Sequence, residues 1–209
     1  YIPTVELADV LDFLTVQGLH QVGIVGTSRG GIITMLMAAA RPTAMGPIVL
    51  NDIGPVIETR GLARIVNYLR QMPSPKTWAD AIQIIREINE RGFPEFTDAQ
   101  WDQMARSVFE ERKGRLVLSY DQKLAKAIGT IDLSRPFPSL WPEFIALSKM
   151  PTFVIRGEHS DILSAETLNE MVERHPNLRT MTIPQQGHAP TLAEPDQVDA
   201  IASFFAVND

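Results

Sequence analysis

The chain has 209 residues, of which 44% are hydrophobic and 21% charged, and its formal net charge at pH 7 is −6. These values are typical of one globular domain with a sizeable core, and the negative charge gives no reason to expect a nucleic acid or an anionic membrane surface as partner. The sequence contains no cysteine, which excludes disulfides, thiolate zinc sites and a cysteine nucleophile.

Helices and apolar strands alternate in the first part of the chain. A helix is expected from Pro3 to about Gly18, a strand over 22–25, a helix from about 32 to 40, and a buried strand over 47–51. This alternation is typical of a parallel sheet that is covered by helices on both faces.

Between about residues 58 and 149 the pattern changes to that of amphipathic helices. Apolar residues recur at helical spacing over 62–69 and over 78–88, and a capping box at 97–100 begins a third helix. Residues 116–120 and 123–128 are ambiguous. An all-helical segment inside a series of strands and helices is typical of a lid inserted above one end of the sheet, and residues 58–149 are called the lid segment below.

The alternation then resumes. The sequence predicts a strand over 152–156, a helix over 164–174, a strand over 179–183 and a closing helix over 195–205. The predicted fold is therefore an α/β core of about four parallel strands, with the lid segment inserted between the two parts of the core. Those two parts are residues 1–57 and 150–209.

A tight turn is predicted at Gly26-Thr27-Ser28-Arg29-Gly30-Gly31, between the strand over 22–25 and the helix that follows. A Gly-x-Ser-x-Gly sequence in this position is typical of a nucleophile elbow, in which a strained turn exposes the serine hydroxyl. Gly26 and Gly30 are expected to prevent collisions where the strand and the helix nearly touch. The alternative is an ordinary turn serine.

A serine nucleophile needs a base and an acid that orients the base, and two later loops offer them. The strand over 152–156 leads to Asp161, and the strand over 179–183 leads to His188. We expect both loops at the sheet edge that carries Ser28. Two alternatives stay open for the acid: Asp161 caps the following helix, or Asp52, after the strand over 47–51, takes its place. His188 could also be an ordinary loop histidine.

The other histidines are not expected to take part. His159 lies too close to Asp161 along the chain to face it, so a place on the surface or behind the site is expected. His20 and His175 are expected at helix ends, facing solvent or capping. The histidines are not spaced as metal ligands, and no phosphate-binding glycine motif occurs, so the sequence predicts neither a metal nor a nucleotide cofactor.

Taken together, the motifs resemble those of the α/β-hydrolase superfamily, in its lidded esterase, lactonase and C–C hydrolase branch. The similarity covers essentially all of the chain, and the lid segment is its least specific part. The resemblance implies that Ser28 is the nucleophile, His188 the general base and then acid, and Asp161 the residue that orients it. It also implies that the backbone N–H of Arg29 is one oxyanion donor.

Serine at the elbow, where some relatives with this fold have aspartate, implies acyl chemistry on a small molecule. Esters, thioesters, lactones and activated amides stay open, and an ester or lactone is the expected substrate. Hydrolysis of a carbon–carbon bond in a ring-cleavage product and a small-molecule receptor on the same scaffold are the alternatives. One or two apolar residues of the lid segment are expected to line the substrate pocket. The candidates are Phe93, Phe109, Phe137, Leu140 and Trp141.

The resemblance also concerns what precedes Tyr1. The family has further strands, and a loop with a second oxyanion donor, ahead of the first helix of this chain. The native protein is therefore expected to be longer by very roughly 70–90 residues. A cytoplasmic location is expected because the absence of cysteine fits that compartment. No apolar run approaches the roughly 20 residues of a membrane-spanning helix, and no feature indicates an oligomeric state.

Overall fold

Four parallel strands form the central sheet of the computed structural model, which describes residues 1–128, 135 and 137–208. The strand order is β1-β2-β5-β6. The strands are β1 (Val22–Thr27), β2 (Met45–Asn51), β5 (Thr152–Gly157) and β6 (Leu178–Ile183). Each predicted strand is thus confirmed to within two residues at either end, and so is the parallel pairing.

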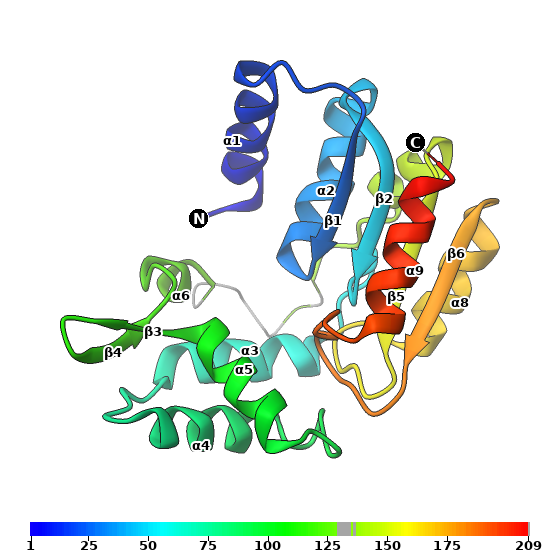
Figure 1. Ribbon diagram of the computed structural model, residues 1–209. Helices are drawn as coiled ribbons and strands as arrows, with labels where there is room; N and C mark the ends of the chain where they lie inside the picture. The colour runs from blue at the N-terminus through cyan, green and yellow to red at the C-terminus, as the bar shows by residue number, and fades with distance from the viewer. Residues whose placement is uncertain (129–134, 136, 209) are drawn as a thin grey trace.

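Helices cover both faces of this sheet (Figure 1). One face packs against α9 (Pro195–Ala206), and the other packs against α2 (Arg29–Ala40), α7 (Trp141–Ala146) and α8 (Ala165–Arg174). Helix α1 (Pro3–Val16) lies against α2. Burial on both faces explains why the two central strands are continuously apolar instead of alternating.

The central strands show this two-sided burial residue by residue. In β2, Ile48 and Leu50 pack with the α2 and α8 side, whereas Val49 packs with the α9 side. In β5, Phe153 lies on the α9 side and Val154 on the other. All five side chains are fully buried, so the sheet is a rigid platform for the loops at its ends.

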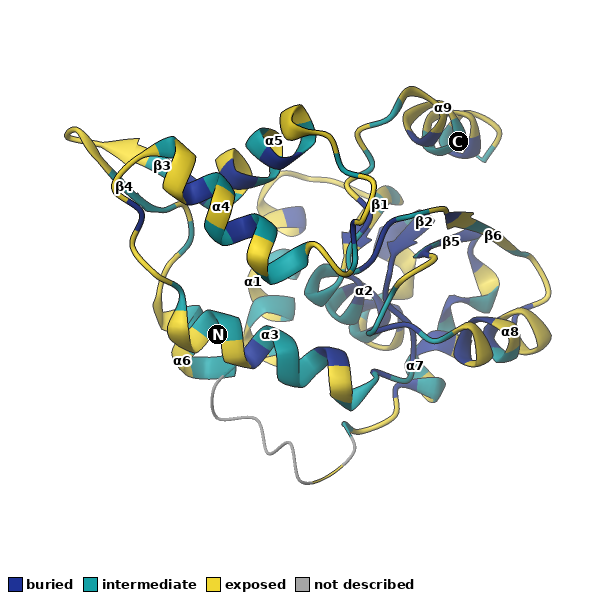
Figure 2. Cartoon of the chain, turned by 90° about the horizontal axis from the view of Figure 1, so that it is seen from below, coloured by how far each residue is buried: buried dark blue, intermediate teal, exposed yellow. Residues whose placement is uncertain are grey.

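From α3 (Thr59–Gln71) to α6 (Lys123–Ile128) the lid segment lies beyond the carboxyl ends of the strands, where the arrowheads point in Figure 1, whereas α7, near its end, packs against α2 in the core. The lid segment begins with α3, α4 (Trp78–Asn89) and α5 (Asp98–Val108). Helices α4 and α5 share a small core of their own with Phe93 and Phe109, and Figure 2 shows buried stretches along both helices. Residues 129–134 and 136 of this segment lie outside the described part of the chain.

The expectation that the lid segment is all helical is wrong at residues 109–118. Strands β3 (Phe109–Arg112) and β4 (Arg115–Leu118) form an antiparallel hairpin there, and α6 (Lys123–Ile128) follows it. The two turn residues, Lys113 and Gly114, have φ angles of 52° and 72°. A two-residue turn with positive φ at both positions matches the right-handed twist of the two strands that it connects.

His175 lies at the C-terminal end of α8, as expected, but it is buried, so the expectation that it faces solvent is wrong. Only 2% of the residue is exposed, its Nε2 lies 3.2 Å from the carbonyl oxygen of Leu147, and its ring packs against Phe144. Burial lowers the pKa of this imidazole below its ordinary value of 6.5, although its backbone hydrogen bonds oppose that shift. The imidazole of His175 therefore binds a proton less readily in the folded protein than in the unfolded chain.

We expect this difference to make the protein less stable as the solution becomes acidic. Because the folded pKa is depressed, the unfolded state binds more protons below 6.5, and stability falls with pH by at most about 1.4 kcal/mol per pH unit. Thermal unfolding measured between about pH 7.5 and 5.5 should show a smaller decrease for His175→Gln than for the wild type. His20→Gln, a change at an exposed histidine, should show the same decrease of stability with pH as the wild type. Equal slopes for all three proteins would contradict this account.

Candidate active site

Ser28 occupies the turn between a strand and a helix, as the sequence predicts. Strand β1 ends at Thr27 and α2 begins at Arg29, so Ser28 alone connects them. Its backbone has φ 49° and ψ −114°, a conformation that side-chain-bearing residues seldom adopt. Such strain at a strand-to-helix turn is typical of a nucleophile elbow.

Close packing around this turn depends on two glycines. A methyl group at Gly26 would lie 2.9 Å from the Cα of Gly31, and one at Gly31 would collide with the side chain of Ile53. At Gly30 a methyl group would meet open space. The expectation for Gly26 is therefore confirmed, whereas the close approach assigned to Gly30 belongs to Gly31.

Two hydrogen bonds connect Ser28, His188 and Asp52. The Oγ of Ser28 lies 2.8 Å from Nε2 of His188, and Nδ1 of His188 lies 2.8 Å from Oδ2 of Asp52. Both distances fit a hydroxyl that donates to Nε2 and an Nδ1–H that donates to the carboxylate. The side chain of His188 is 6% exposed and that of Asp52 is fully buried, so little water competes for these bonds.

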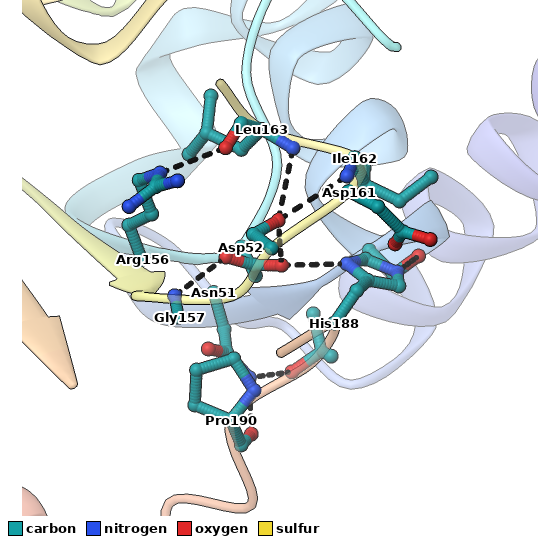
Figure 3. A network of polar contacts seen from close by, with 12 residues as sticks. Asn51, Asp52, Arg156, Gly157, Asp161, Ile162, Leu163, His188 and Pro190 are labelled. Atoms are coloured by element: carbon teal, nitrogen blue, oxygen red, sulfur yellow. Dashed lines mark hydrogen bonds and ion pairs between the residues drawn. The ribbon is translucent and has the colours of Figure 1, made fainter. Parts of the chain in front are cut away.

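The Asp52 carboxylate is held by the loop after β5 (Figure 3). The backbone N–H of Gly157 donates to Oδ1 at 2.7 Å, and the hydroxyl of Ser160 donates to Oδ2 at 2.6 Å. The Ser160 oxygen in turn accepts hydrogen bonds from the backbone N–H groups of Ile162 and Leu163. A buried carboxylate needs such donors, and these fix its orientation toward His188.

Asp161 has a different partner from the one expected. Its two carboxylate oxygens accept hydrogen bonds of 2.6 and 2.8 Å from Nε and Nη2 of Arg64 on α3. Burial acts to raise the pKa of the Asp161 carboxyl, but Arg64 and the nearby His188 outweigh it, and the pKa lies below its ordinary value of 3.8. The expectation that Asp161 orients His188 is therefore corrected, because the structure gives that place to Asp52. Capping of α8, the other reading of Asp161, is done by Ser164.

The two carboxylates follow different strands of the sheet. Asp52 follows β2, which pairs directly with β1 and therefore ends beside Ser28. Asp161 follows β5, which is one strand farther from β1. The partners of the two carboxylates separate them, because Asp52 binds Nδ1 of His188 whereas Asp161 binds Arg64 of α3.

Asn51 connects the elbow to the histidine loop and was not singled out from the sequence. Its side-chain amide donates to Oγ1 of Thr27 at 3.2 Å and to the carbonyl oxygen of Pro190 at 2.9 Å. Its backbone carbonyl accepts a hydrogen bond from the N–H of Ser28. The signal in the sequence is the polar pair Asn51-Asp52 at the end of a buried strand.

The backbone N–H of Arg29 is placed where an oxyanion donor is expected. Arg29 is the first residue of α2, and the first N–H groups of a helix have no acceptor within it. The side chain points elsewhere, since Nε and Nη2 bind the carboxylate of Glu6 on α1 at 2.7 and 2.9 Å. The role of this N–H remains a prediction.

A cavity of about 630 Å³ is lined both by the lid segment and by loops at the edge of the sheet, and it reaches His188. Of the apolar lid residues expected in the pocket, Phe93 lines this cavity, whereas Phe109 and Leu140 are buried in packing elsewhere. His159 is exposed at the cavity wall, 3.2 Å from Oε1 of Gln185. In the described ranges no three His, Asp or Glu side chains form a metal-binding group, and no helix is long and apolar enough to cross a membrane.

Comparison with known proteins finds relatives with the same fold. Residues 2–201 match the alpha/beta hydrolase family. An alpha/beta hydrolase of known structure from Novosphingobium aromaticivorans is 35% identical with a TM-score of 0.88, over 99% of this chain and 72% of that one. A putative hydrolase from Rickettsia typhi is 24% identical with a TM-score of 0.85, over 100% and 70%. The 3-hydroxybutyrate-oligomer hydrolase of Cupriavidus necator is 28% identical over 98% of this chain and 72% of its own length.

Proposed function

The chain belongs to the alpha/beta hydrolase family, and we propose that it hydrolyses carboxylic esters through an acyl-enzyme formed on Ser28. The observation that carries this proposal is the pair of 2.8 Å hydrogen bonds that joins Ser28 to His188 and His188 to Asp52. A hydroxyl, an imidazole and a buried carboxylate in this order activate a serine for attack on a carbonyl carbon.

The reaction uses each group in turn. As the Ser28 oxygen attacks the ester carbonyl carbon, Nε2 of His188 takes the hydroxyl proton, and Asp52 stabilises the imidazolium through Nδ1–H. The tetrahedral intermediate expels the alcohol, which receives the proton from Nε2. Water then attacks the acyl-enzyme with His188 again as base, and the carboxylic acid leaves as Ser28 regains its proton.

The negative oxygen of the tetrahedral intermediate needs N–H donors that are already in place. We assign one of them to the backbone N–H of Arg29, at the beginning of α2. The positive end of the helix dipole adds to its effect there. Donors of this kind stabilise the transition state more than the substrate, because charge develops on the oxygen only during attack.

The relative from Cupriavidus necator suggests a narrower substrate class. It is named for the hydrolysis of 3-hydroxybutyrate oligomers, which are linear esters of a short hydroxy acid. We therefore propose linear esters of short acids as the first substrates to test, and lactones as the second. The cavity of about 630 Å³ beside His188 is large enough for such small molecules.

A panel of substrates tests the proposal. Purified protein is incubated with 4-nitrophenyl esters of graded acyl length, with the linear dimer of 3-hydroxybutyrate and with one lactone. Turnover of at least one ester by the wild type, and none by Ser28→Ala, is the expected result. Tight binding of these compounds without turnover by the wild type would instead favour a receptor on this scaffold.

A further inference from the structure

The lid segment touches the edge of the sheet through two glycines. A methyl group at Gly61 of α3 would collide with the backbone oxygen of Asp161. A methyl group at Gly187 would lie 2.9 Å from the Cα of Gly92, in the turn after α4. Lid backbone therefore packs directly onto the loops that carry Asp161 and His188.

An arginine precedes each of the two lid glycines along the chain. Arg60 and Arg91 both line the cavity that reaches His188, and both are exposed to it. The close approach of the glycines brings these two guanidinium groups, from different lid elements, to the rim of one cavity. Neither side chain makes a hydrogen bond or an ion pair with any residue that the structure describes.

The cavity carries an excess of positive charge although the chain as a whole has a net charge of −6. Its lining contains three arginines and two carboxylates. Arg64 and Asp161 bind each other through two hydrogen bonds, and their opposite charges cancel. Among the remaining lining residues, Arg60 and Arg91 are positive and Glu58 is negative, so the lining carries one excess positive charge.

We propose that Arg60 and Arg91 bind a carboxylate group of the substrate, so that the enzyme prefers esters with an anionic end. This inference rests on the proposed ester hydrolysis at Ser28. The guanidinium group offers paired N–H donors that match the two oxygens of a carboxylate. Ile88 and Phe93 line the same cavity and supply apolar surface for a short carbon chain between the carboxylate and the ester.

The test compares substrates that differ only in this charge. Mono-4-nitrophenyl esters of glutaric, adipic and suberic acid are each paired with the same ester carrying a methyl-capped second carboxyl. We expect the wild type to favour the acid over its capped partner by about tenfold in kcat/KM at the best chain length, as one charge-assisted hydrogen bond allows. In Arg60→Gln/Arg91→Gln this ratio should fall to about one, mainly through KM.

Arg115→Gln is the matched control, because it removes the same charge from the exposed end of β4. It should keep the ratio of the wild type. A ratio that is unchanged in the double variant, or already near one in the wild type, would overturn the proposal.

A binding measurement separates this inference from the proposed catalysis. Calorimetry on Ser28→Ala protein should show that monomethyl adipate binds more tightly than dimethyl adipate, and that adding Arg60→Gln and Arg91→Gln removes the difference. This result would support the carboxylate site even if no ester were turned over. Equal binding of the two compounds would overturn it, even in an active esterase.

Discussion

Replacing Asp52 with asparagine is expected to lower kcat for a 4-nitrophenyl ester by about 10³–10⁴-fold. Asparagine keeps the size of the side chain but removes the charge that stabilises the imidazolium of His188. The asparagine amide can also donate to Nδ1, and the imidazole proton would then sit on Nε2. A protonated Nε2 cannot accept the hydroxyl proton of Ser28. Initial rates of nitrophenol release at saturating substrate measure the effect.

Asp161→Asn is the matched comparison, because it makes the same chemical change in the neighbouring loop. We expect a loss of less than about tenfold, since the oxygens of Asp161 bind Arg64 rather than His188. Circular dichroism and the melting temperature establish that both variants are folded. A larger loss for Asp161→Asn than for Asp52→Asn would restore Asp161 as the acid and contradict the geometry described above.

Ser28→Ala is expected to lower kcat by about 10⁵–10⁶-fold, because no other group replaces the nucleophile. His188→Ala should cost about as much, and the double variant little more than either alone, since the two residues act as a unit. Steady-state rates for the three variants measure this non-additivity. Losses that multiply in the double variant would show that the serine and the histidine act independently.

Ser203→Ala serves as the control for these measurements. Ser203 is an exposed serine on α9, and its replacement should leave the rate unchanged. Residual activity of Ser28→Ala that approaches that of this control would contradict a covalent role for Ser28.

Local patterns in the sequence were sufficient to predict the sheet and two of the three residues in the hydrogen-bonded chain. Continuous apolar runs marked β2 and β5, and glycines around Ser28 marked the elbow. His188 could be predicted because it follows the last strand, whose carboxyl end must lie at the same edge of the sheet.

The choice between Asp52 and Asp161 required information that is not local. The order of residues along the chain does not show that donors in and after β5 hold the Asp52 carboxylate, or that Asp161 is bound by another residue. The arginine that binds Asp161 comes from α3, nearly a hundred residues earlier. Nothing near Asp161 in the sequence indicates that partner.

Packing within the lid segment and the core was equally hard to anticipate. The hairpin at 109–118 has charged residues at its turn and only four residues in each strand, too few for a clear period of two. His175 looked like a polar helix end, yet α7 and the turn after it cover the ring. In both cases tertiary contacts decide the outcome.

Covalent labelling with a fluorophosphonate tests the central claim most directly. The phosphorus accepts the Ser28 oxygen and loses fluoride, so one equivalent of label should add to the wild type, and peptide mapping should place it on Ser28. His188→Ala and Asp52→Asn should react far more slowly, whereas Asp161→Asn should react at close to the rate of the wild type. Folded wild-type protein that stays unlabelled, or that carries the label on another residue, would contradict the account.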